Sequence, residues 1–222
     1  MARAWARELL GESSPVDFFL SPLRFVSSER TARSLSLTLS GEHCYGLAFG
    51  PEPPLNPTWT SCSIDQSSFG DHLGPLVAND QWDFFSIDTA GSSRQSSVEE
   101  VSDDDLIAEI LTEHAPLSRV WPGNKEIVNW YGVRDHQGRW ASIGALVRWE
   151  SGRHVIVSVV TVSAQRGQGL AQLLLSGMVA EARRRNIRWL GLGVAHDNLA
   201  AQRTYERTGF VARANFTNYA LA

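Results

Sequence analysis

The spacing of hydrophobic residues in the second half of the chain predicts strands followed by helices. Three strand-like runs, Ile127–Arg134, Trp140–Trp149 and Val155–Val162, are joined by short turns that each contain a glycine. Strand runs with such short connections are typical of antiparallel neighbours. We therefore expect a three-stranded meander.

After the meander the hydrophobic period changes to that of an amphipathic helix. A further strand, Ile187–Val194, a second helix, Asn198–Thr208, and a last strand, Phe210–Leu221, then follow. Gly209 stands where a glycine commonly ends a helix. This β-β-β-α-β-α-β order predicts an α/β (α+β) fold with a mixed sheet. Five residues make the apolar face of the first helix: Leu170, Leu173, Leu174, Gly177 and Met178.

The first half of the chain has fewer periodic signals. A helix is expected over Ala2–Leu10, and the alternation of leucine with serine or threonine over Ser34–Ser40 predicts a half-buried strand. A turn would join this strand to Cys44–Phe49 as a hairpin, and four prolines between positions 51 and 57 then enforce a loop. The apolar run Trp82–Ile87 predicts one more strand.

A serine-rich stretch with little to bury separates the two halves. We expect an N-terminal α/β domain over residues 1–90, a linker over 91–102 and a second domain over 103–222. The acidic triplet Asp103–Asp105 opens a helix in the second domain, because acids stabilise the positive end of the helix dipole. Pro116 stops that helix.

The composition excludes several classes of protein. Of the 222 residues, 43% are hydrophobic and 20% are charged, as in a globular protein with a core. A net charge of −4 argues against nucleic-acid binding, and the most apolar run, Val155–Val162, is far shorter than the roughly 20 residues that cross a membrane. Cys44 and Cys62 form neither a disulfide framework nor a metal-ligand spacing. We expect a cytoplasmic protein without a metal site, a nucleic-acid partner or a membrane partner.

A glycine-rich turn carries the clearest candidate chemistry. The segment Gln165–Ala171 leads straight from a strand into a helix. Unpaired N–H groups at a helix start, together with the helix dipole, make a pyrophosphate site. Gly167 and Gly169 would let phosphates approach the backbone, and Arg166 would add a charge-assisted contact. Tight packing of the turn is the alternative explanation for these glycines.

Two other nucleotide signatures do not fit this turn. A Rossmann fingerprint would need a third glycine where the chain has Gln172, and a Walker loop would need a lysine, but the only lysine is Lys125. The pattern Arg166-x-x-Gly169-x-Ala171 instead resembles the Arg/Gln-x-x-Gly-x-Gly/Ala signature of the GNAT (Gcn5-related N-acetyltransferase) family. The later run from Asn198 through Tyr205 to Gly-Phe210 resembles the Asn…Tyr…Gly-Phe helix of that family.

The resemblance covers about residues 103–222, and it implies roles for particular residues. Asn198 would bond the pantetheine region of acetyl-CoA, and Tyr205 would protonate the departing thiolate. Asn198, Ala201 and Tyr205 share one helix face by their spacing. The alternatives are a plain helix N-cap for Asn198 and a core residue for Tyr205. The backbone of two further residues would pair with pantetheine: Thr161 and Val162. The amides of six would hold the pyrophosphate: Arg166, Gly167, Gln168, Gly169, Leu170 and Ala171.

The catalytic base is not evident from the sequence. Members of the family commonly carry a glutamate on the strand before the glycine turn, whereas this strand has no carboxylate. Relatives also often have a proline where this chain has Ser163-Ala164, so a bulge that splays the strands is not visible in the sequence. Four candidates for the base remain open: Glu150, His154, Ser158 through a water, and His196.

The resemblance implies an acetyl-CoA-dependent N-acetyltransferase, in which a primary amine of a small molecule or peptide attacks the thioester directly. A transferase of a longer acyl-CoA and a non-catalytic CoA-binding module are the alternatives, and a homodimer is left open. Residues 1–100 carry no family motif, but the hairpin at 33–49 and the strand at 82–87 are compatible with a degenerate partial copy of the same fold. These residues hold six arginines and thirteen acids, and their net negative charge would favour a cationic acceptor or serve solubility alone.

Overall fold

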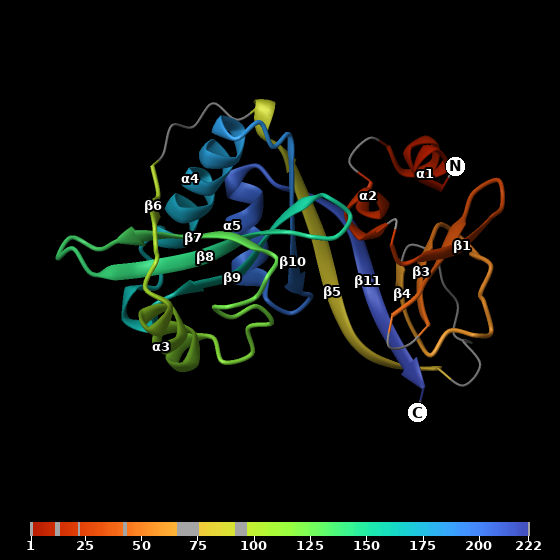
Figure 1. The fold of residues 1–222 in the computed structure, drawn as a ribbon, viewed down its shortest axis with the longest axis horizontal. Coiled ribbons are helices and arrows are strands. Elements are labelled where there is room, and N and C mark those ends of the chain that lie inside the picture. Colours follow the sequence, from red (N-terminus) through yellow and green to blue (C-terminus); the bar gives the residue numbers. More distant parts are fainter. Residues whose placement is uncertain are drawn as a thin grey trace.

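The computed structural model describes residues 2–11, 14–21, 23–41, 44–65, 76–91 and 97–221. The described strands form one eleven-stranded sheet in the order β1-β2-β3-β4-β11-β5-β10-β9-β8-β7-β6 (Figure 1). The strands are β1 (Phe25–Arg30), β2 (Leu35–Leu39), β3 (Tyr45–Phe49), β4 (Ser61–Asp65), β5 (Leu76–Asp88), β6 (Glu99–Glu100), β7 (Ile127–Arg134), β8 (Trp140–Arg148), β9 (His154–Thr161), β10 (Trp189–Ala195) and β11 (Val211–Leu221). The helices are α1 (Ala2–Leu10), α2 (Pro15–Phe19), α3 (Asp104–His114), α4 (Leu170–Arg184) and α5 (Leu199–Thr208), with single 3-10 turns η2 (Thr89–Gly91) and η3 (Ser163–Gln165).

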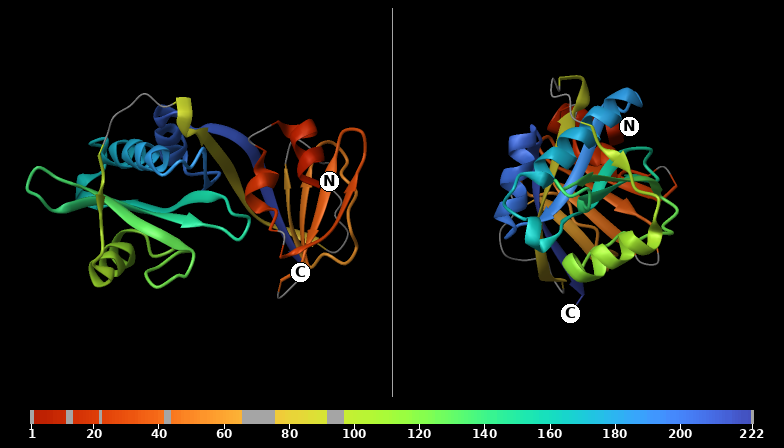
Figure 2. Two further views of the ribbon diagram at one scale, coloured as in Figure 1. Left: turned by 45° about the horizontal axis from the view of Figure 1, so that its top comes forward. Right: turned by 90° about the vertical axis from the view of Figure 1, so that its left-hand side faces the viewer.

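Helices cover both faces of the sheet (Figure 2). On one face, Leu174 of α4 and Tyr205 of α5 join a core cluster with strand residues such as Leu192. On the other face, Ile107 of α3 and Phe18 of α2 belong to a single second cluster. The two clusters are the apolar faces that the helical and strand periods predict, packed from opposite sides of the sheet.

The element order predicted for the second half is confirmed. β7, β8 and β9 pair as an antiparallel meander, and α4, β10, α5 and β11 follow in turn. The Asp103 carboxylate caps α3 by accepting from the Leu106 N–H at 3.0 Å. Gly209 ends α5 with a φ of +103°, which a glycine adopts without strain. The predicted fold class, a mixed α/β sheet, is therefore confirmed.

The parallel strands β9 and β10 separate part of the way along their length. They pair only over the first residues, from Leu190 with His154 to Leu192 with Ile156. Beyond that point Ser158 has a φ of +51°, and the register with β8 shifts. The Ser158 hydroxyl donates to the Val120 carbonyl at 2.8 Å. This irregularity lies before Ser163-Ala164, where relatives often carry a proline, and it opens the sheet beside β9.

The first half of the sheet repeats the strand succession of the second half. β1, β2 and β3 form an antiparallel meander and β4 lies parallel to β3, just as β10 lies parallel to β9 after its own meander. The two halves exchange their next strands, because β5 pairs with β10 while β11 pairs with β4. β5 and β11 also pair with each other at the centre. This symmetry agrees with a degenerate partial copy of the fold at the N-terminus.

The parallel pair of the first half is closed, unlike its counterpart. β3 and β4 pair from Tyr45–Ser61 to Ala48–Ile64, and a proline-containing loop rather than a helix connects them. The indole of Trp59 covers this pair and lies against Gly46, so closely that a Cβ on this glycine would fall 2.2 Å from the ring. The Trp59 Nε1 donates to the Thr38 hydroxyl at 2.9 Å. No cleft equivalent to that beside β9 is left between these two strands.

The expectation that β2 is half-buried is wrong, because all five residues from Leu35 to Leu39 are buried. The leucine side of the strand faces the core cluster that contains Phe18. On the serine and threonine side, Thr38 accepts from Trp59. A loop distant in sequence therefore covers the face that the alternation assigned to solvent. Three strands and one helix of the described chain were also not predicted: β1, β4, β6 and α2.

The central sheet crosses the predicted domain boundaries. β5, assigned to the N-terminal domain, pairs with β10 and β11, and β6 lies within the predicted linker. Val98 of that linker packs against Gly177 of α4. The boundaries at residues 90 and 103 stay a prediction, because a continuous sheet does not tell where an independently folding unit ends.

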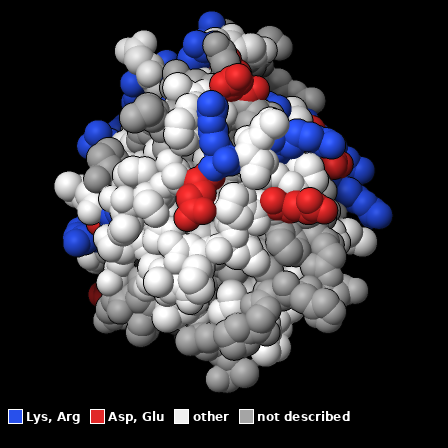
Figure 3. Space-filling model, turned by 90° about the vertical axis from the view of Figure 1, so that its right-hand side faces the viewer, with Lys and Arg blue, Asp and Glu red and all other residues white. Residues whose placement is uncertain are grey.

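The end of the molecule that carries α1 and β1 shows a broad uncharged area among its described residues (Figure 3). β1 is the edge strand there, and Phe25 and Val26 are exposed on it.

In the described part of the chain no helix is long and apolar enough to cross a membrane. The homodimer left open by the sequence stays a prediction.

Candidate functional site

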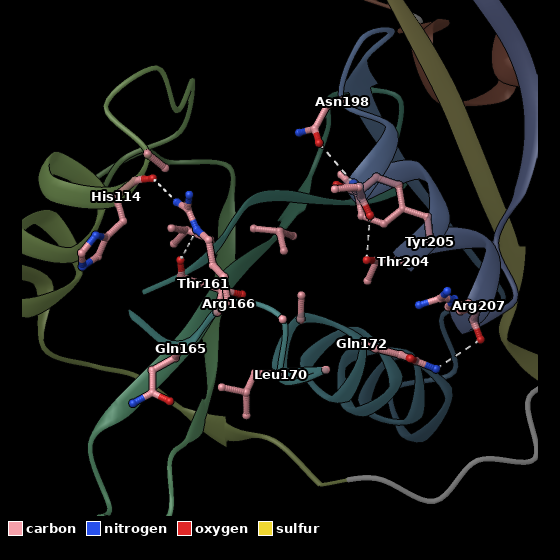
Figure 4. Close-up of a pocket in the computed structure, with 18 residues that line it drawn as sticks. His114, Thr161, Gln165, Arg166, Leu170, Gln172, Asn198, Thr204, Tyr205 and Arg207 are labelled. Atoms are coloured by element: carbon pink, nitrogen blue, oxygen red, sulfur yellow. Dashed lines mark hydrogen bonds between the residues drawn. The ribbon is translucent and has the colours of Figure 1, made fainter. Parts of the chain in front are cut away.

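A cavity of about 560 Å³ lies where β9 and β10 separate (Figure 4). The end of β9, the loop after it, the first turn of α4 and one face of α5 line this cavity. Eight of the ten residues expected in the site line it, whereas Val162 and Gln168 do not. The eight are Thr161, Arg166, Gly167, Gly169, Leu170, Ala171, Asn198 and Tyr205.

The glycine turn presents bare backbone to the cavity. Gly167 and Gly169 have φ values of +79° and +76°, the left-handed conformation that favours glycine. A Cβ added at either position would meet no protein atom within 4 Å, so the space above each is open. Gly169 is also the N-cap of α4, and no side chain caps this helix. The first N–H groups of α4 are therefore placed to bind an anion.

The backbone of β9 offers alternate residues to the cavity. The Val162 N–H donates to the Ala141 carbonyl of β8 at 2.9 Å, and the Val160 carbonyl accepts from the Ser142 hydroxyl. In an antiparallel ladder the residues that alternate with Val160 and Val162 point their N–H and C=O groups to the opposite edge. Those residues are Val159 and Thr161, and both line the cavity, as Val160 between them also does.

Val159 is thus a site residue that the sequence reasoning missed. Because backbone groups alternate along a strand, the groups at the open edge of β9 belong either to Val160 and Val162 or to Val159 and Thr161. The sequence does not tell which set faces β8, since that depends on the register with another strand. The backbone amide of Val162 is occupied within the sheet.

Arg166 points away from the first turn of α4. Its Nε donates to the Thr161 carbonyl at 3.2 Å and its Nη2 donates to the His114 carbonyl at 3.1 Å (Figure 4). The guanidinium therefore joins the open edge of β9 to the C-terminus of α3. The sequence had placed this charge on a phosphate, and the hydrogen bonds of the side chain assign it to two carbonyl groups of the chain.

Asn198 caps α5 and leaves part of its amide available. Its Oδ1 accepts from the Ala201 N–H at 3.1 Å, as an N-cap side chain does. Among the described residues its Nδ2 makes no hydrogen bond. Because Asn198 lines the cavity, one side chain can cap the helix and donate to a ligand.

Tyr205 is buried between the sheet and the cavity. Its ring packs edge-on against Phe85 with centroids 5.7 Å apart, and Phe210 lies beside it. Burial raises the pKa of Tyr205 from its usual value of 10 to about 12. Within the described part of the chain its hydroxyl has no hydrogen-bond partner. The residue is thus both a core side chain and a neutral donor beside the cavity.

None of the four candidates for the base lines the cavity. Glu150 forms an ion pair with Arg24 at 2.6 Å, and Ser158 donates to Val120. Burial lowers the pKa of His154, which lies at the start of β9. The Nδ1 of His196 is 2.9 Å from Oδ2 of Asp83, and the same carboxylate oxygen accepts from Gln202 of α5 at 2.8 Å. No group of three or more metal-ligating side chains exists among the described residues.

The model of the acetyltransferase (GNAT) family matches residues 77–210, which is more than half of the chain. The chain belongs to the GNAT acetyltransferase family. The match begins at β5, so the family's fold includes the strand that the sequence had assigned to the N-terminal domain. Membership implies an acyl-CoA co-substrate and the acyltransferase class, and the resemblance seen in the two motifs is confirmed.

Solved structures share this fold at low sequence identity. An acetyltransferase of the GNAT family from Colwellia psychrerythraea superposes with a TM-score of 0.56 at 11% identity, covering 99% of this chain and 94% of its own. A GCN5-related N-acetyltransferase from Kribbella flavida gives 0.56 at 14% identity, covering 87% of this chain and 88% of its own. A third, from Sphaerobacter thermophilus, gives 0.52 at 15%, covering 84% and 75%. No curated protein sequence matches the chain.

Proposed function

We propose that this GNAT protein is an N-acetyltransferase that moves the acetyl group of acetyl-CoA to a primary amine of a small molecule or peptide. The observation that carries the proposal is the continuous cavity from the open edge of β9 to the uncapped start of α4. A strand edge suits the two amides of a pantetheine arm, and a helix start suits a pyrophosphate. The two features adjoin in the order in which those groups occur in an acyl-CoA.

The backbone of Val159 and Thr161 would pair with the pantetheine arm as a further strand does. The Thr161 carbonyl keeps a second lone pair for this contact while it accepts from Arg166. The Nδ2 of Asn198 would donate to the same arm. The amides of residues 166–171, that of Gln168 included, would hold the pyrophosphate.

Tyr205 would act on the leaving sulfur. The amine nitrogen attacks the thioester carbon, the carbon–sulfur bond breaks, and the thiolate leaves while the amine loses a proton to solvent. With a pKa of about 12, the Tyr205 phenol stays neutral at physiological pH and can donate a hydrogen bond to the thiolate. Full proton transfer to a thiolate with a pKa of about 8.5 would be uphill, so stabilisation by the donated hydrogen bond is the expected main effect.

Calorimetric titration with acetyl-CoA, free CoA and octanoyl-CoA tests the cofactor part of the proposal. We expect micromolar binding of acetyl-CoA, with weaker binding of the longer acyl-CoA. Tighter binding of octanoyl-CoA would favour a transferase of longer acyl groups. If folded protein binds none of the three, the proposal is wrong and the GNAT fold serves another purpose here.

An assay of released CoA thiol against a set of primary amines tests the transfer itself. Release that depends on both acetyl-CoA and one amine class would identify the acceptor. If acetyl-CoA binds but no amine leads to release of the CoA thiol, the result would instead favour a CoA-binding module.

A further inference from the structure

Two arginines are among the described residues that line the cavity, and they lie at its opposite ends. In Figure 4, Arg166 and Thr161 lie to one side of the first turn of α4, which carries Leu170 and Gln172, and Arg207 lies to the other side. The guanidinium of Arg166 is bonded to two carbonyl groups at the β9 end. Arg207 is the arginine at the far end among the described residues that line the cavity.

The position of Arg207 is fixed by the packing of α5 on α4. Arg207 is exposed in the last turn of α5, and Gln172 Nε2 lies 3.5 Å from its carbonyl oxygen. This contact holds the end of α5 beside the start of α4. The arginine thus lies beside the start of α4, on the side away from Arg166 and Thr161 (Figure 4).

The shape of an acyl-CoA decides what reaches Arg207. The molecule is linear, with the thioester and pantetheine at one end, the pyrophosphate in the middle and an adenosine with a 3′-phosphate at the other end. When pantetheine lies on β9 and the pyrophosphate on α4, the adenosine end continues past Gln172. A phosphate dianion is the group that a guanidinium binds best, through two parallel hydrogen bonds.

We propose that Arg207 binds the 3′-phosphate of the acyl-CoA and makes this protein prefer CoA over its 3′-dephospho form. The inference rests on the proposed function, since it takes the direction of the bound co-substrate from that proposal. The same helix provides a matched control. Arg203 is exposed one turn earlier on α5 and does not line the cavity.

Calorimetric titration with CoA and with 3′-dephospho-CoA tests this for the wild-type protein, Arg207→Gln, Arg207→Lys and Arg203→Gln. We expect the wild type to bind CoA about tenfold more tightly than 3′-dephospho-CoA, as one partly exposed charge-assisted contact supplies. Arg207→Gln should bind both compounds alike, with the affinity that the wild type has for the dephospho form. Arg207→Lys should keep part of the preference, and Arg203→Gln all of it.

Three results would overturn the inference. Equal binding of both compounds by the wild type would remove any 3′-phosphate site. A preference that survives in Arg207→Gln would place that site elsewhere. An Arg207→Gln variant that loses affinity for both compounds by the same factor would assign the arginine to the pyrophosphate. If the wild type binds neither compound, the proposed function fails together with the inference, whereas the three results above leave it intact. Unchanged thermal melting of the variants shows that they are folded.

Discussion

The Nη2 of Arg153 lies 3.1 Å from Oδ2 of Asp17, a carboxylate whose side chain is only 1% exposed. This ion pair joins α2 to the turn between β8 and β9, and thus connects the two halves of the chain. A second pair, Arg24 with Glu150, makes the same connection nearby, but the Arg24 side chain is 56% exposed. The two pairs therefore differ mainly in burial.

Arg153→Met should destabilise the protein much more than Arg24→Met does. The substitution removes one partner of a buried ion pair, which costs about 3 kcal/mol in the free energy of unfolding. Loss of the exposed pair should cost less than about 1 kcal/mol. Urea denaturation of both variants measures the difference, and equal losses would contradict the dominant role of burial.

Gly169→Ala should weaken acetyl-CoA binding at least about tenfold, because a Cβ there would enter the space expected for the pyrophosphate. Gly123→Ala is the matched control. Gly123 has a φ of +84° and open space above it, so both alanines suffer a similar backbone strain of about 1 kcal/mol. Calorimetry on both variants separates a binding role from a folding role. Equal affinity in the two variants would leave the turn as a purely structural feature.

Tyr205→Phe should lower kcat about 10- to 100-fold while KM for acetyl-CoA changes little. The substitution removes the hydroxyl of a residue that lines the cavity and leaves the ring packed against Phe85. Tyr219→Phe on β11 makes the same chemical change outside the cavity and should leave kcat unaltered. Steady-state rates of CoA release provide the measurement, and an unchanged kcat in Tyr205→Phe would exclude this tyrosine from the reaction.

Stability should fall steeply at alkaline pH. Burial raises the pKa values of Tyr45 and Tyr205 from 10, and of the Cys62 thiol from 9, to about 12 in each case. Between those values the unfolded chain loses protons that the folded chain keeps, so its free energy falls relative to the folded state. Each tyrosine contributes of the order of 2 kcal/mol, present below pH 10 and lost as the pH rises towards 12.

Urea denaturation between pH 8 and pH 11 measures this loss. Tyr45→Phe removes one of the three groups, so its stability should decline less steeply above pH 10 than that of the wild type. Identical slopes would show that Tyr45 does not contribute.

The helices and strands of residues 127–221 follow from the sequence because their signals are local. Period, turn residues and caps each act within a few positions, as Asp103 and Gly209 illustrate. The glycine turn and the Asn198–Tyr205 face were readable for the same reason. The edge strand β1 and the short strands β4 and β6 carry too few periodic residues to show such a pattern.

The site itself depends on register, which the sequence does not contain. Whether Val162 or Val159 faces the cavity follows from the pairing of β9 with β8. The direction of Arg166 follows from the place of the His114 carbonyl, which is 52 residues away in the chain. Both are decided by which distant segments meet.

The sequence alone therefore determined the family, the order of elements in the second half and the backbone turn that would bind phosphate. Each of these depends on residues that are close together in the sequence. Only the tertiary structure decided that the strands part at Ser158, that β5 and β11 exchange between the two halves, and that Arg207 rather than Arg166 stands at the far end of the cavity. Those features arise from contacts between segments far apart in the chain. Their stability comes from packing and pairing that no single stretch of residues encodes.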